Sequence, residues 1–523
     1  MQPSHPPHHL NHSSRANPAT DANLSLPAGN GGDRTQLPRT SRRALLSAAA
    51  GAVAVWPIAW RRTASTAAEL PQDELLHEAA PGEAAPREAA PREAAPREAA
   101  PRGDDRSGTD DLEGGPRATS GDAAREPRWD ERLEIRVGPR EADLVGSSDR
   151  VLQAAVDYVA ALGGGTVRIL PGEYRLRNAV HLRSGVRIVG SRADSVLVKE
   201  PSQRTLLARD SDWYDQEITL ADPTGFQIGD GVLLEARNPH HGGQTVLKRT
   251  LVARSGSRFK LDRPLRENLW RAGEASCASL FPLITANESC DLAIEDVVLD
   301  GRCADNENLN GNWGGCIFLQ DVSRCLIRGV TARNYNGDGI SWQVAHDVRV
   351  EACESRGHAG LGLHPGSGSQ RPVIRGNRIE DCSIGIFFCW GVKFGLAEEN
   401  RVEECGVGIS IGHRDTDNRL AGNLVRGSRQ TAVLFRPERG QGFTGDRNRL
   451  VENVLEDNGP EDGAAVDVEG LTDRLVLERN RIVETRSPAR RAGIRLGAEV
   501  GEVQLIDNQI TGFAQAVDDR RPA

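Results

Sequence analysis

The chain has 523 residues, a formal net charge of −9, 56 glycines and 28 prolines. Aromatic residues make up 4% and hydrophobic residues 38%, so either part of the chain is unfolded or its core is narrow. The negative charge gives no support to nucleic-acid binding, which needs a basic face to neutralise phosphates. All nine cysteines lie between Cys277 and Cys405 without a CxxC spacing, which argues against a zinc ribbon or a disulfide scaffold and favours buried thiols.

Residues 1–68 are predicted to be a disordered leader that contains an export signal. The first 40 residues are rich in His, Pro, Ser and Asn and have no periodicity. The adjacent Arg42 and Arg43, followed by the apolar run 44–60, resemble a twin-arginine export signal, which implies a periplasmic or extracellular protein. The alternative is an uncleaved signal that tethers the protein to a membrane. About 17 apolar residues are marginal for a span, so we expect no stable membrane span after processing.

Residues 69–130 are predicted to be a disordered linker. The tetrapeptide "EAAP" recurs every five residues from Glu78 to Glu98, mostly as "EAAPR". Proline in each repeat removes an amide donor and clashes with a helix, so this segment reads as a semi-extended, charge-alternating spacer. We expect it to carry no chemistry.

The remainder, residues 131–523, repeats short apolar strands at a period of roughly 23 residues, as in "GISWQ", "GIFFC" and "GISIG". The second position of each unit is apolar throughout: Ile317, Ile340, Leu361, Ile386, Ile409, Val433, Val466 and Ile494. So is the fourth: Leu319, Trp342, Leu363, Phe388, Ile411, Phe435, Val468 and Leu496. Because alternate side chains point to opposite faces of a strand, these two columns face inward and the third and fifth face outward. The pattern predicts an all-β, right-handed parallel β-helix.

Three further features fit this fold. A turn that recurs between the strands places an asparagine at the same point of several units, which predicts a hydrogen-bonded ladder of Asn377, Asn400, Asn423 and Asn480. The apolar spacing of "SDRVLQAAVDYVAAL" predicts an amphipathic helix, capped by Ser148 or Asp149, that covers the open end of the coil. Residues 215–266 break the repeat and are predicted to form a small β insertion.

The run "GGGTVRILPGEYRLRNAVHLRSGVRIVG" and the repeats after it resemble the pectate-lyase-like superfamily, in its branch of rhamnogalacturonase-like and epimerase-like proteins. The resemblance covers residues 140–520 and implies a polysaccharide substrate; we expect a monomer. Polygalacturonase-like hydrolases resemble this fold and carry four short motifs on successive rungs. Only Asn336 and Asp338 match the first of them here, which speaks against that mechanism.

Residues capable of chemistry concentrate on the outward side of consecutive rungs. The predicted outward fifth column is Gln320, Gln343, His364, Cys389, Gly412, Arg436, Glu469 and Gly497. Neighbouring rungs are about 4.8 Å apart, so residues two rungs apart can act on one sugar unit. The predicted catalytic residues are Asp338, His364, His413, Arg414, Asp415 and Arg436, and the predicted substrate-binding residues are Gln343, Phe387, Trp390 and Ser410. No Asp-rich cluster indicates calcium, so we assign no metal and no cofactor.

A lyase or an epimerase acting on a uronate needs a group that neutralises the carboxylate, a base for the C-5 proton and an acid for the leaving oxygen. Arg414 or Arg436 suits the first role, and His364 or His413 suits the others. Two alternatives stay open: glycoside hydrolysis through Asp338 and Asp415, which requires carboxylates about 6.5–9.5 Å apart for inversion, and a non-catalytic carbohydrate-binding or structural β-helix. In the latter case Arg414 and Asp415 would form an ion pair that only stabilises a turn.

Overall fold

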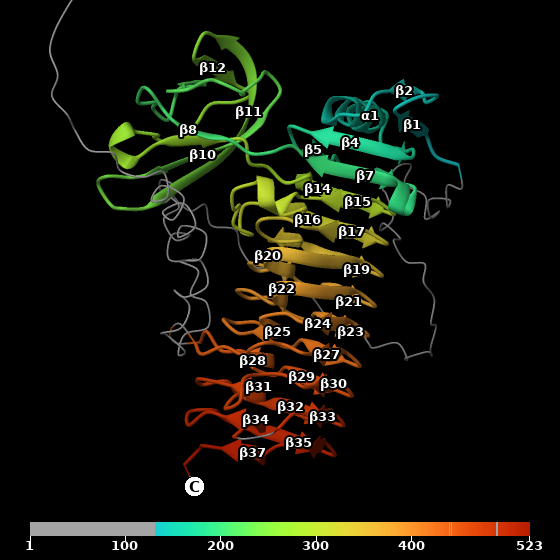
Figure 1. The fold of residues 1–523 in the computed structure, drawn as a ribbon, viewed down its shortest axis with the longest axis vertical. Helices are drawn as coiled ribbons and strands as arrows, with labels where there is room; N and C mark the ends of the chain where they lie inside the picture. The colour runs from blue at the N-terminus through green and yellow to red at the C-terminus, as the bar shows by residue number, and fades with distance from the viewer. Residues whose placement is uncertain (1–130, 439, 441, 488–489, 523) are drawn as a thin grey trace, which may run out of the picture. The chain divides into compact units, whose positions relative to one another are not determined.

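The computed structural model describes residues 131–522 except 439, 441, 488 and 489. The predicted leader, export signal and linker therefore lie outside the described residues. The described part contains one parallel sheet of 31 strands that winds as a parallel β-helix (Figure 1). Among the described residues, no helix is both long enough and apolar enough to cross a membrane.

Three ladders of parallel strands run along the coil. The first contains β5 (Val180–His181), β14 (Ile284–Glu295), β16 (Ile317–Arg328), β18 (Ile340–Gln343), β20 (Glu354–Pro365), β22 (Arg378–Phe387), β25 (Val407–Ile411), β28 (Thr431–Phe435), β31 (Ala464–Val468), β34 (Ala492–Leu496) and β37 (Gln515–Asp519). The second contains β1 (Glu134–Gly138), β3 (Gly165–Ile169), β6 (Val186–Val189), parts of β14 and β16, β19 (His346–Glu351), β21 (Val373–Arg375), β23 (Leu396–Glu398), β26 (Arg419–Ala421), β29 (Arg449–Val451), β32 (Leu475–Glu478) and β35 (Val503–Ile506). The third contains β4 (Gly172–Leu176), β7 (Ser195–Lys199), β15 (Val298–Asp300), β17 (Thr331–Arg333), parts of β20 and β22, β24 (Arg401–Glu403), β27 (Leu424–Arg426), β30 (Val454–Glu456), β33 (Arg481–Val483) and β36 (Gln509–Thr511). The short β2 (Leu144–Val145) pairs with β1.

The predicted inward columns are confirmed for all rungs but one. Ile317 pairs with Ile340, and Ile386 pairs with Ile409, as the columns require. These side chains and Trp342 are at most 1% exposed and belong to one continuous apolar core. Since each rung hides only a few side chains, the core is narrow, which accounts for the modest hydrophobic content.

The exception is the rung that contains "GLGLHPG". Ile340 pairs with Leu363 rather than with Leu361, so the predicted alignment is wrong by two residues at this rung. The period itself is unbroken here, because Ile340, Leu363, Ile386 and Ile409 follow one another at 23 residues. The prediction counted this unit from Gly360, whereas Gly362 is the glycine that occupies the first position. Leu361 consequently leaves the main core and packs in a small outer cluster with Phe387 and Cys389. His364 moves from the predicted fifth column to the third.

The asparagine ladder is confirmed and is longer than predicted. Asn377 Nδ2 donates to Asn400 Oδ1 at 2.9 Å, and Asn400 Nδ2 donates to Asn423 Oδ1 at 2.9 Å. The series continues through Asn453, Asn480 and Asn508. Each amide also donates to a backbone carbonyl, as Asn400 does to Ile374 O at 2.8 Å. Backbone groups that a turn leaves without strand partners are thereby satisfied inside the protein.

A helix covers the first turn of the coil, as predicted. This helix, α1 (Asp149–Ala161), begins after Ser148, whose side chain makes no capping hydrogen bond. Its apolar stripe, which includes Leu152, Val156 and Val159, is buried in the main core. The helix thus protects the end of an otherwise open stack of strands.

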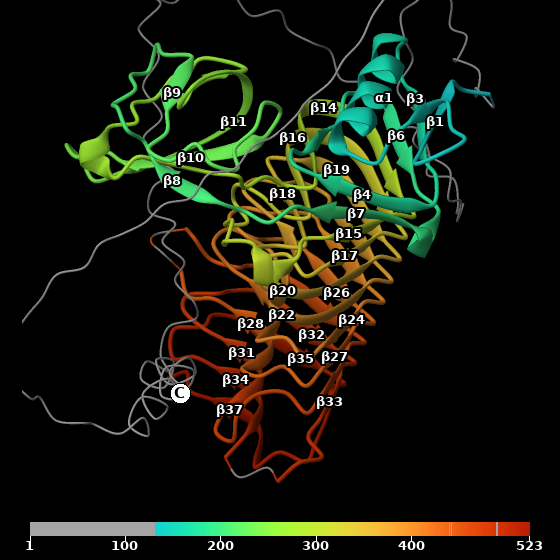
Figure 2. The ribbon, with the colours of Figure 1, turned by 45° about the horizontal axis from the view of Figure 1, so that its top comes forward.

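A second, antiparallel sheet interrupts the coil between β7 and β14. It contains β8 (Arg204–Leu206), β9 (Glu217–Thr219), β10 (Gly231–Arg237), β11 (Gln244–Ser255), β12 (Arg258–Leu261) and β13 (Ser276–Ala278). This sheet extends on both sides of the expected segment 215–266, and it has a core of its own around Leu234, Phe259 and Leu261. Short 3-10 turns, η1 (Arg192–Asp194), η2 (Arg271–Gly273) and η3 (Cys303–Asp305), lie before, inside and after it. Figure 2 shows the insertion as a separate green sheet beside the first rungs.

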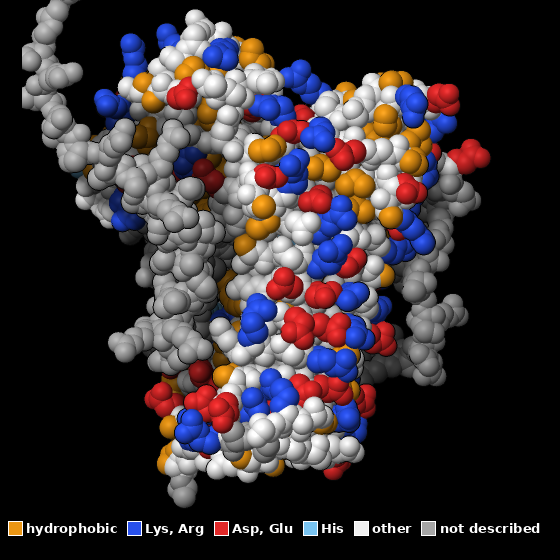
Figure 3. All heavy atoms as spheres, viewed as in Figure 1, with side chains coloured by type: hydrophobic (Ala, Val, Ile, Leu, Met, Phe, Trp, Pro, Cys, Tyr) orange, Lys and Arg blue, Asp and Glu red, His pale blue; other side chains and the backbone are white. Residues whose placement is uncertain are grey.

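Ion pairs cover the outside of the third ladder. Figure 3 shows basic and acidic side chains intermingled on this face. Arg426 contacts Glu456 on the next rung at 2.5 Å, and Arg401 contacts Glu403 on its own strand at 2.5 Å. Exposed pairs of this kind each contribute little to stability, about 0–1 kcal/mol. They give this face mixed charge and no strong preference for an anionic or a cationic polymer.

Candidate functional site

Three of the predicted site residues, His364, Phe387 and Ser410, lie on the third, outward column of the first ladder. With the corrected register, this column reads Phe318, Ser341, His364, Phe387, Ser410 and Leu434. The His364 and Phe387 rings lie 5.4 Å apart, centre to centre. His364 therefore stands between a serine and a phenylalanine, one rung from each.

An Asp–His pair forms the centre of this column. The His364 Nδ1–H group donates to Asp338 Oδ2 at 2.8 Å, and the other carboxylate oxygen accepts from the Leu361 amide at 2.9 Å. Both side chains are almost fully buried, with 2% of His364 and 3% of Asp338 exposed. Asp338 ends the turn before β18, and His364 lies near the end of β20, so the pair joins adjacent rungs.

The environment of His364 makes it a strong base. Burial lowers the pKa of this imidazole, but its hydrogen bonds with Asp338 and Cys389 and the charge of Asp338 outweigh burial and raise the pKa to about 9. At neutral pH the pair is therefore an imidazolium–carboxylate ion pair. An imidazole with an aspartate at Nδ1 is held in one orientation and is stabilised when it takes up a proton.

Ser341 and Gln343 complete the surroundings of the pair. Ser341 Oγ lies 3.3 Å from His364 Nδ1 and donates to Gly311 O at 2.7 Å, while Gln343 Nε2 donates to Ser341 Oγ at 3.3 Å. A side-chain carbon at Gly311 would overlap the Asp338 carboxylate. The loop that contains Gly311 thus packs directly against the Asp338 carboxylate.

A second group, next along the column, is built around Arg436. Its guanidinium donates to Ser410 Oγ at 2.6 Å, to Phe388 O at 2.7 Å and to Asp415 Oδ2 at 3.2 Å. It also lies over the Phe387 ring, 4.3 Å from the ring centre. Phe387 is therefore placed between the Asp338–His364 pair and Arg436.

Asp415 serves the backbone of its turn. Its Oδ1 accepts the amides of Gly391 and Val392 at 2.9 Å each, and its Oδ2 accepts the Gly412 amide at 3.0 Å. Burial raises the pKa of Asp415 to about 6, although Arg436 and these amides lower it. The carboxylate is thus ionised at neutral pH and bound on both oxygens by protein donors.

His413, Arg414 and Trp390 form a third group at the rim. The Trp390 ring lies 5.5 Å from the His413 ring and 5.3 Å from the Phe443 ring, and the Arg414 guanidinium lies 3.7 Å above Phe443. His413, Arg414 and Trp390 all have positive φ, at 52°, 72° and 67°. Non-glycine residues in this conformation are strained, and such strain is often found at functional sites.

The structure therefore divides the predicted site into three neighbouring groups. The side-chain hydrogen bonds of His364 described above go to Asp338 and Ser341, which lie on the preceding rung and outside the other two groups. By rung and strand spacing, His413 lies about 14 Å from His364 along the face. A single sugar unit cannot contact both imidazoles, but a chain of several units can extend from one to the other.

Four residues near these groups were not predicted. Ser341 and Cys389 contact the pair, Phe443 contacts the rim group, and Lys248 of the insertion lies over Phe318 at 3.9 Å from its ring centre. Ser341 is in the outward third column, so its position was available from the sequence. Phe443 and Lys248 lie outside the repeat, and no period of the sequence indicates where they dock.

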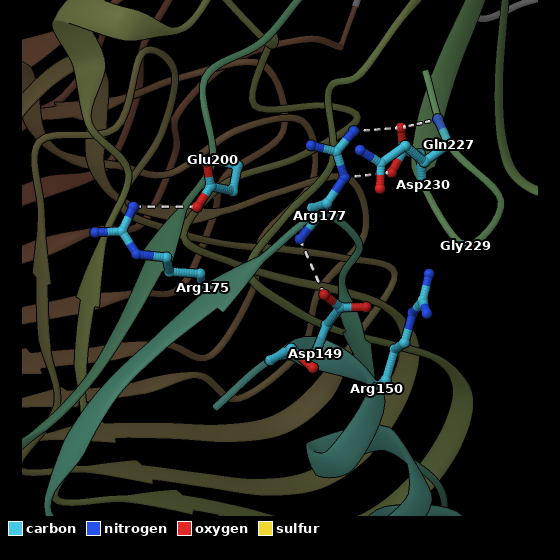
Figure 4. Close-up of a pocket in the computed structure, with 9 residues that line it drawn as sticks. Asp149, Arg150, Arg175, Arg177, Glu200, Gln227, Gly229 and Asp230 are labelled. Carbon is cyan, nitrogen blue, oxygen red and sulfur yellow. Dashed lines mark hydrogen bonds and ion pairs between the residues drawn. The ribbon is translucent and has the colours of Figure 1, made fainter. Parts of the chain in front are cut away.

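A cavity of about 460 Å³ lies away from these groups, where the insertion meets the start of the coil (Figure 4). Arg177 donates to both carboxylate oxygens of Asp230, at 2.7 and 2.8 Å, and its amide donates to Asp149. The charged groups of the cavity are thus largely bound to one another, as expected of a joint between two parts of a fold. Within the described part of the chain, no group of three or more His, Cys, Asp or Glu residues is arranged to hold a metal ion.

Comparison with known proteins agrees with the fold. Residues 315–510 match the family model described as "Right handed beta helix region", and the coil is a right-handed parallel β-helix. No curated protein matches this chain. Similar solved structures include the A-module of the Azotobacter vinelandii mannuronan C-5 epimerase AlgE4, with 14% identity over 74% of this chain and 100% of that one and a TM-score of 0.47. Others are a glycoside hydrolase, with 11% identity over 74% and 96% and a TM-score of 0.43, and PfbA, a surface adhesin of Streptococcus pneumoniae, with 12% identity over 71% and 89% and a TM-score of 0.41.

Proposed function

We propose that the protein is an exported enzyme that cleaves a uronate-containing polysaccharide by β-elimination, with His364 as the reacting residue. The observation that carries the proposal is the buried pair in which Asp338 Oδ2 accepts from His364 Nδ1 at 2.8 Å, on the outward column of a β-helix. An imidazole paired in this way is oriented by its aspartate and is a strong base, which abstraction of a weakly acidic C-5 proton requires.

The proposed reaction uses one residue twice. The neutral imidazole of His364 takes the C-5 proton, and the resulting imidazolium is stabilised by Asp338. The same proton then passes to O-4 as the C-4–O-4 bond breaks and the C-4–C-5 double bond forms. Epimerisation begins with the same abstraction but requires a proton donor on the opposite face of the sugar, so the single Asp338–His364 pair favours a lyase.

The rim group suits the binding of a neighbouring sugar unit. The exposed Arg414 lies over Phe443, and Trp390 lies beside both Phe443 and His413. An arginine next to aromatic rings can bind a carboxylate while the rings contact the apolar face of a pyranose. Arg436 suits this role less well, because its guanidinium already donates to Ser410, Phe388 and Asp415.

The contacts of the two aspartates argue against the hydrolase alternative. Asp338 is bound by His364 and the Leu361 amide, and Asp415 is bound by three amides and Arg436. An inverting hydrolase needs one carboxylic acid and one carboxylate facing a water molecule and the sugar. Neither aspartate is arranged in that way.

One observation favours a second candidate, a non-catalytic carbohydrate-binding β-helix. The pair is at most 3% exposed, which suits a structural ion pair as well as a reacting group. In that case the Trp390–Phe443–Arg414 rim would bind the polymer and His364 would only support the rung.

The experiment that separates these candidates is an activity assay on a panel of polyuronates with the full chain. A lyase releases unsaturated uronate ends, which absorb in the ultraviolet, together with new reducing ends. A hydrolase gives reducing ends without the chromophore, and an epimerase gives neither but changes the NMR spectrum of the polymer. His364→Gln should abolish the chromophore, while His358→Gln, a buried control on the same strand, should leave it. Binding without any of these signals would support the second candidate.

A further inference from the structure

A lysine of the insertion reaches the column that contains the Asp338–His364 pair. Lys248 belongs to β11, and its Nζ lies 3.9 Å from the centre of the Phe318 ring and donates to Trp313 O at 2.9 Å. Phe318 pairs with Ser341, and Ser341 pairs with His364. The Lys248 ammonium is therefore about two rungs, or about 10 Å, from the His364 position along the column.

The contacts of the insertion with the coil hold this lysine in place. Thr250, two residues after Lys248 on the same strand, accepts a hydrogen bond from Asn178 Nδ2 at 3.0 Å. The bidentate pair of Arg177 with the buried Asp230 fixes the neighbouring loop, as Figure 4 shows. The position of Lys248 is therefore set by the fold and does not depend on a mobile side chain alone.

Lys248 is in a cationic environment. Burial first, and then the positive charge of Arg263, lower the pKa of Lys248 to about 7. His181, on the strand that continues the same column, also has a lowered pKa because of burial and the charges of Arg183, Lys248 and Arg263, against the charge of Asp262, which raises it. Among the described residues, no carboxylate forms an ion pair with Lys248, whose hydrogen bond goes to a neutral carbonyl.

Such a group favours a bound anion. A half-buried ammonium beside another cation has lost part of its hydration without gaining a negative partner. A bound anion would supply that partner and stabilise the charged form of the lysine. The exposed Arg263, which also lies 3.9 Å from Asp262, leaves the position open to the surface. The Phe318 ring below Lys248 adds an apolar surface on which a sugar ring can lie.

We propose that Lys248, with Arg263 and His181, forms a subsite that binds a carboxylate of the polysaccharide two rungs away from His364. This inference rests on the proposed function, since it assumes that a polysaccharide lies along the third column. It goes further in naming the substrate class, a polymer with carboxylates on units beyond the one that reacts. It also gives the insertion a function, which is to bind the part of the polysaccharide that lies beyond the reacting sugar unit.

The test measures binding of defined oligosaccharides to the full chain by calorimetry. The probes are uronate hexamers, the same hexamers with their carboxylates reduced to alcohols, and a sulfated neutral hexamer. Lys248→Met removes the charge but keeps an apolar side chain over Phe318, and Lys260→Met, on the adjacent β12, is the control because Lys260 is exposed. Lys248→Met should weaken binding of the uronate hexamers about tenfold and leave the reduced hexamers unaffected. Lys260→Met should change neither, and Lys248→Arg should retain the preference for uronates.

Several outcomes would overturn the subsite. One is equal affinity of the wild type and Lys248→Met for the uronate hexamers when both have the same thermal midpoint. Another is equal affinity of the wild type for uronate and reduced hexamers, which would leave the proposed polysaccharide function standing. A preference for the sulfated hexamer would reject the assignment to uronates. No binding of any hexamer would reject the subsite and the proposed function together.

Discussion

The charge of His364 is expected to make the stability of the protein depend on pH. The pKa of His364 is about 9 in the folded chain, against about 6.5 when unfolded. A group whose pKa is raised by folding stabilises the folded state fully below its unfolded pKa, and this contribution is lost as the pH rises through the folded value. The difference corresponds to about 3 kcal/mol of unfolding free energy, lost between about pH 6.5 and about pH 9.

The assay compares denaturant unfolding of wild type and His364→Gln at about pH 6 and about pH 9.5. Wild type should lose about 3 kcal/mol more than the variant between these two conditions, because glutamine cannot titrate. His358→Gln is the matched control. His358 is buried on the same strand, but burial lowers its pKa to about 4, so it is neutral in the folded chain throughout this range. Only its unfolded form titrates near pH 6, so its replacement should change the pH dependence by less than about 1 kcal/mol and in the opposite direction to that of His364. The same pH dependence in wild type and His364→Gln would refute the ion pair.

Four further predictions follow from the same contacts. The kcat/KM on a polyuronate should rise with pH with an apparent pKa near 9, since neutral His364 is the proposed base; a profile flat through this range would contradict that role. Gly311→Ala should displace Asp338, and the pKa of His364, followed by NMR, should fall towards 6.5 while the circular dichroism stays unchanged. Asn400→Ala removes the two bonds that Asn400 donates and the acceptor of two Asn377 N–H groups, so the unfolding free energy should drop by about 3 kcal/mol. A change below about 1 kcal/mol would show that the ladder contributes little to stability. In Arg436→Lys the ammonium cannot reproduce the three hydrogen bonds of the planar guanidinium, so the unfolding free energy should drop by about 2 kcal/mol. An unchanged denaturation midpoint would show that these three bonds do not stabilise the fold.

The coil was predictable because the same packing requirement recurs in every rung. Every rung must place apolar side chains at the same two positions, so the inward columns stand out from the sequence, and Ile340, Ile386 and Ile409 lie where the period requires. The asparagine ladder was predictable for a related reason, because each turn leaves the same backbone groups to satisfy. The predicted ladder missed Asn453 and Asn508, whose units have less regular spacing.

The sequence predicted which residues belong to the candidate site, but not which of them lie next to one another. Outward residues carry no period of their own, so columns alone could not show that Phe387 separates His364 from Arg436. The use of Asp415 by three backbone amides depends on a turn with two successive residues at positive φ, His413 and Arg414, which no repeat indicates. The docking of Lys248 depends on contacts between the insertion and the coil.

The one rung at which the alignment failed is also the rung that holds the Asp338–His364 pair. The failure came from counting this unit from Gly360, whereas the strand repeats from Gly362, which lies 23 residues after Gly339 and 23 before Gly385. Counted from Gly362, His364 occupies the third column, next to Ser341 and within reach of Asp338 on the preceding rung. The strict period was therefore sufficient to place the proposed reacting group. The sequence "GLGLH" hid it because it offers two glycines, and only the second one continues the column.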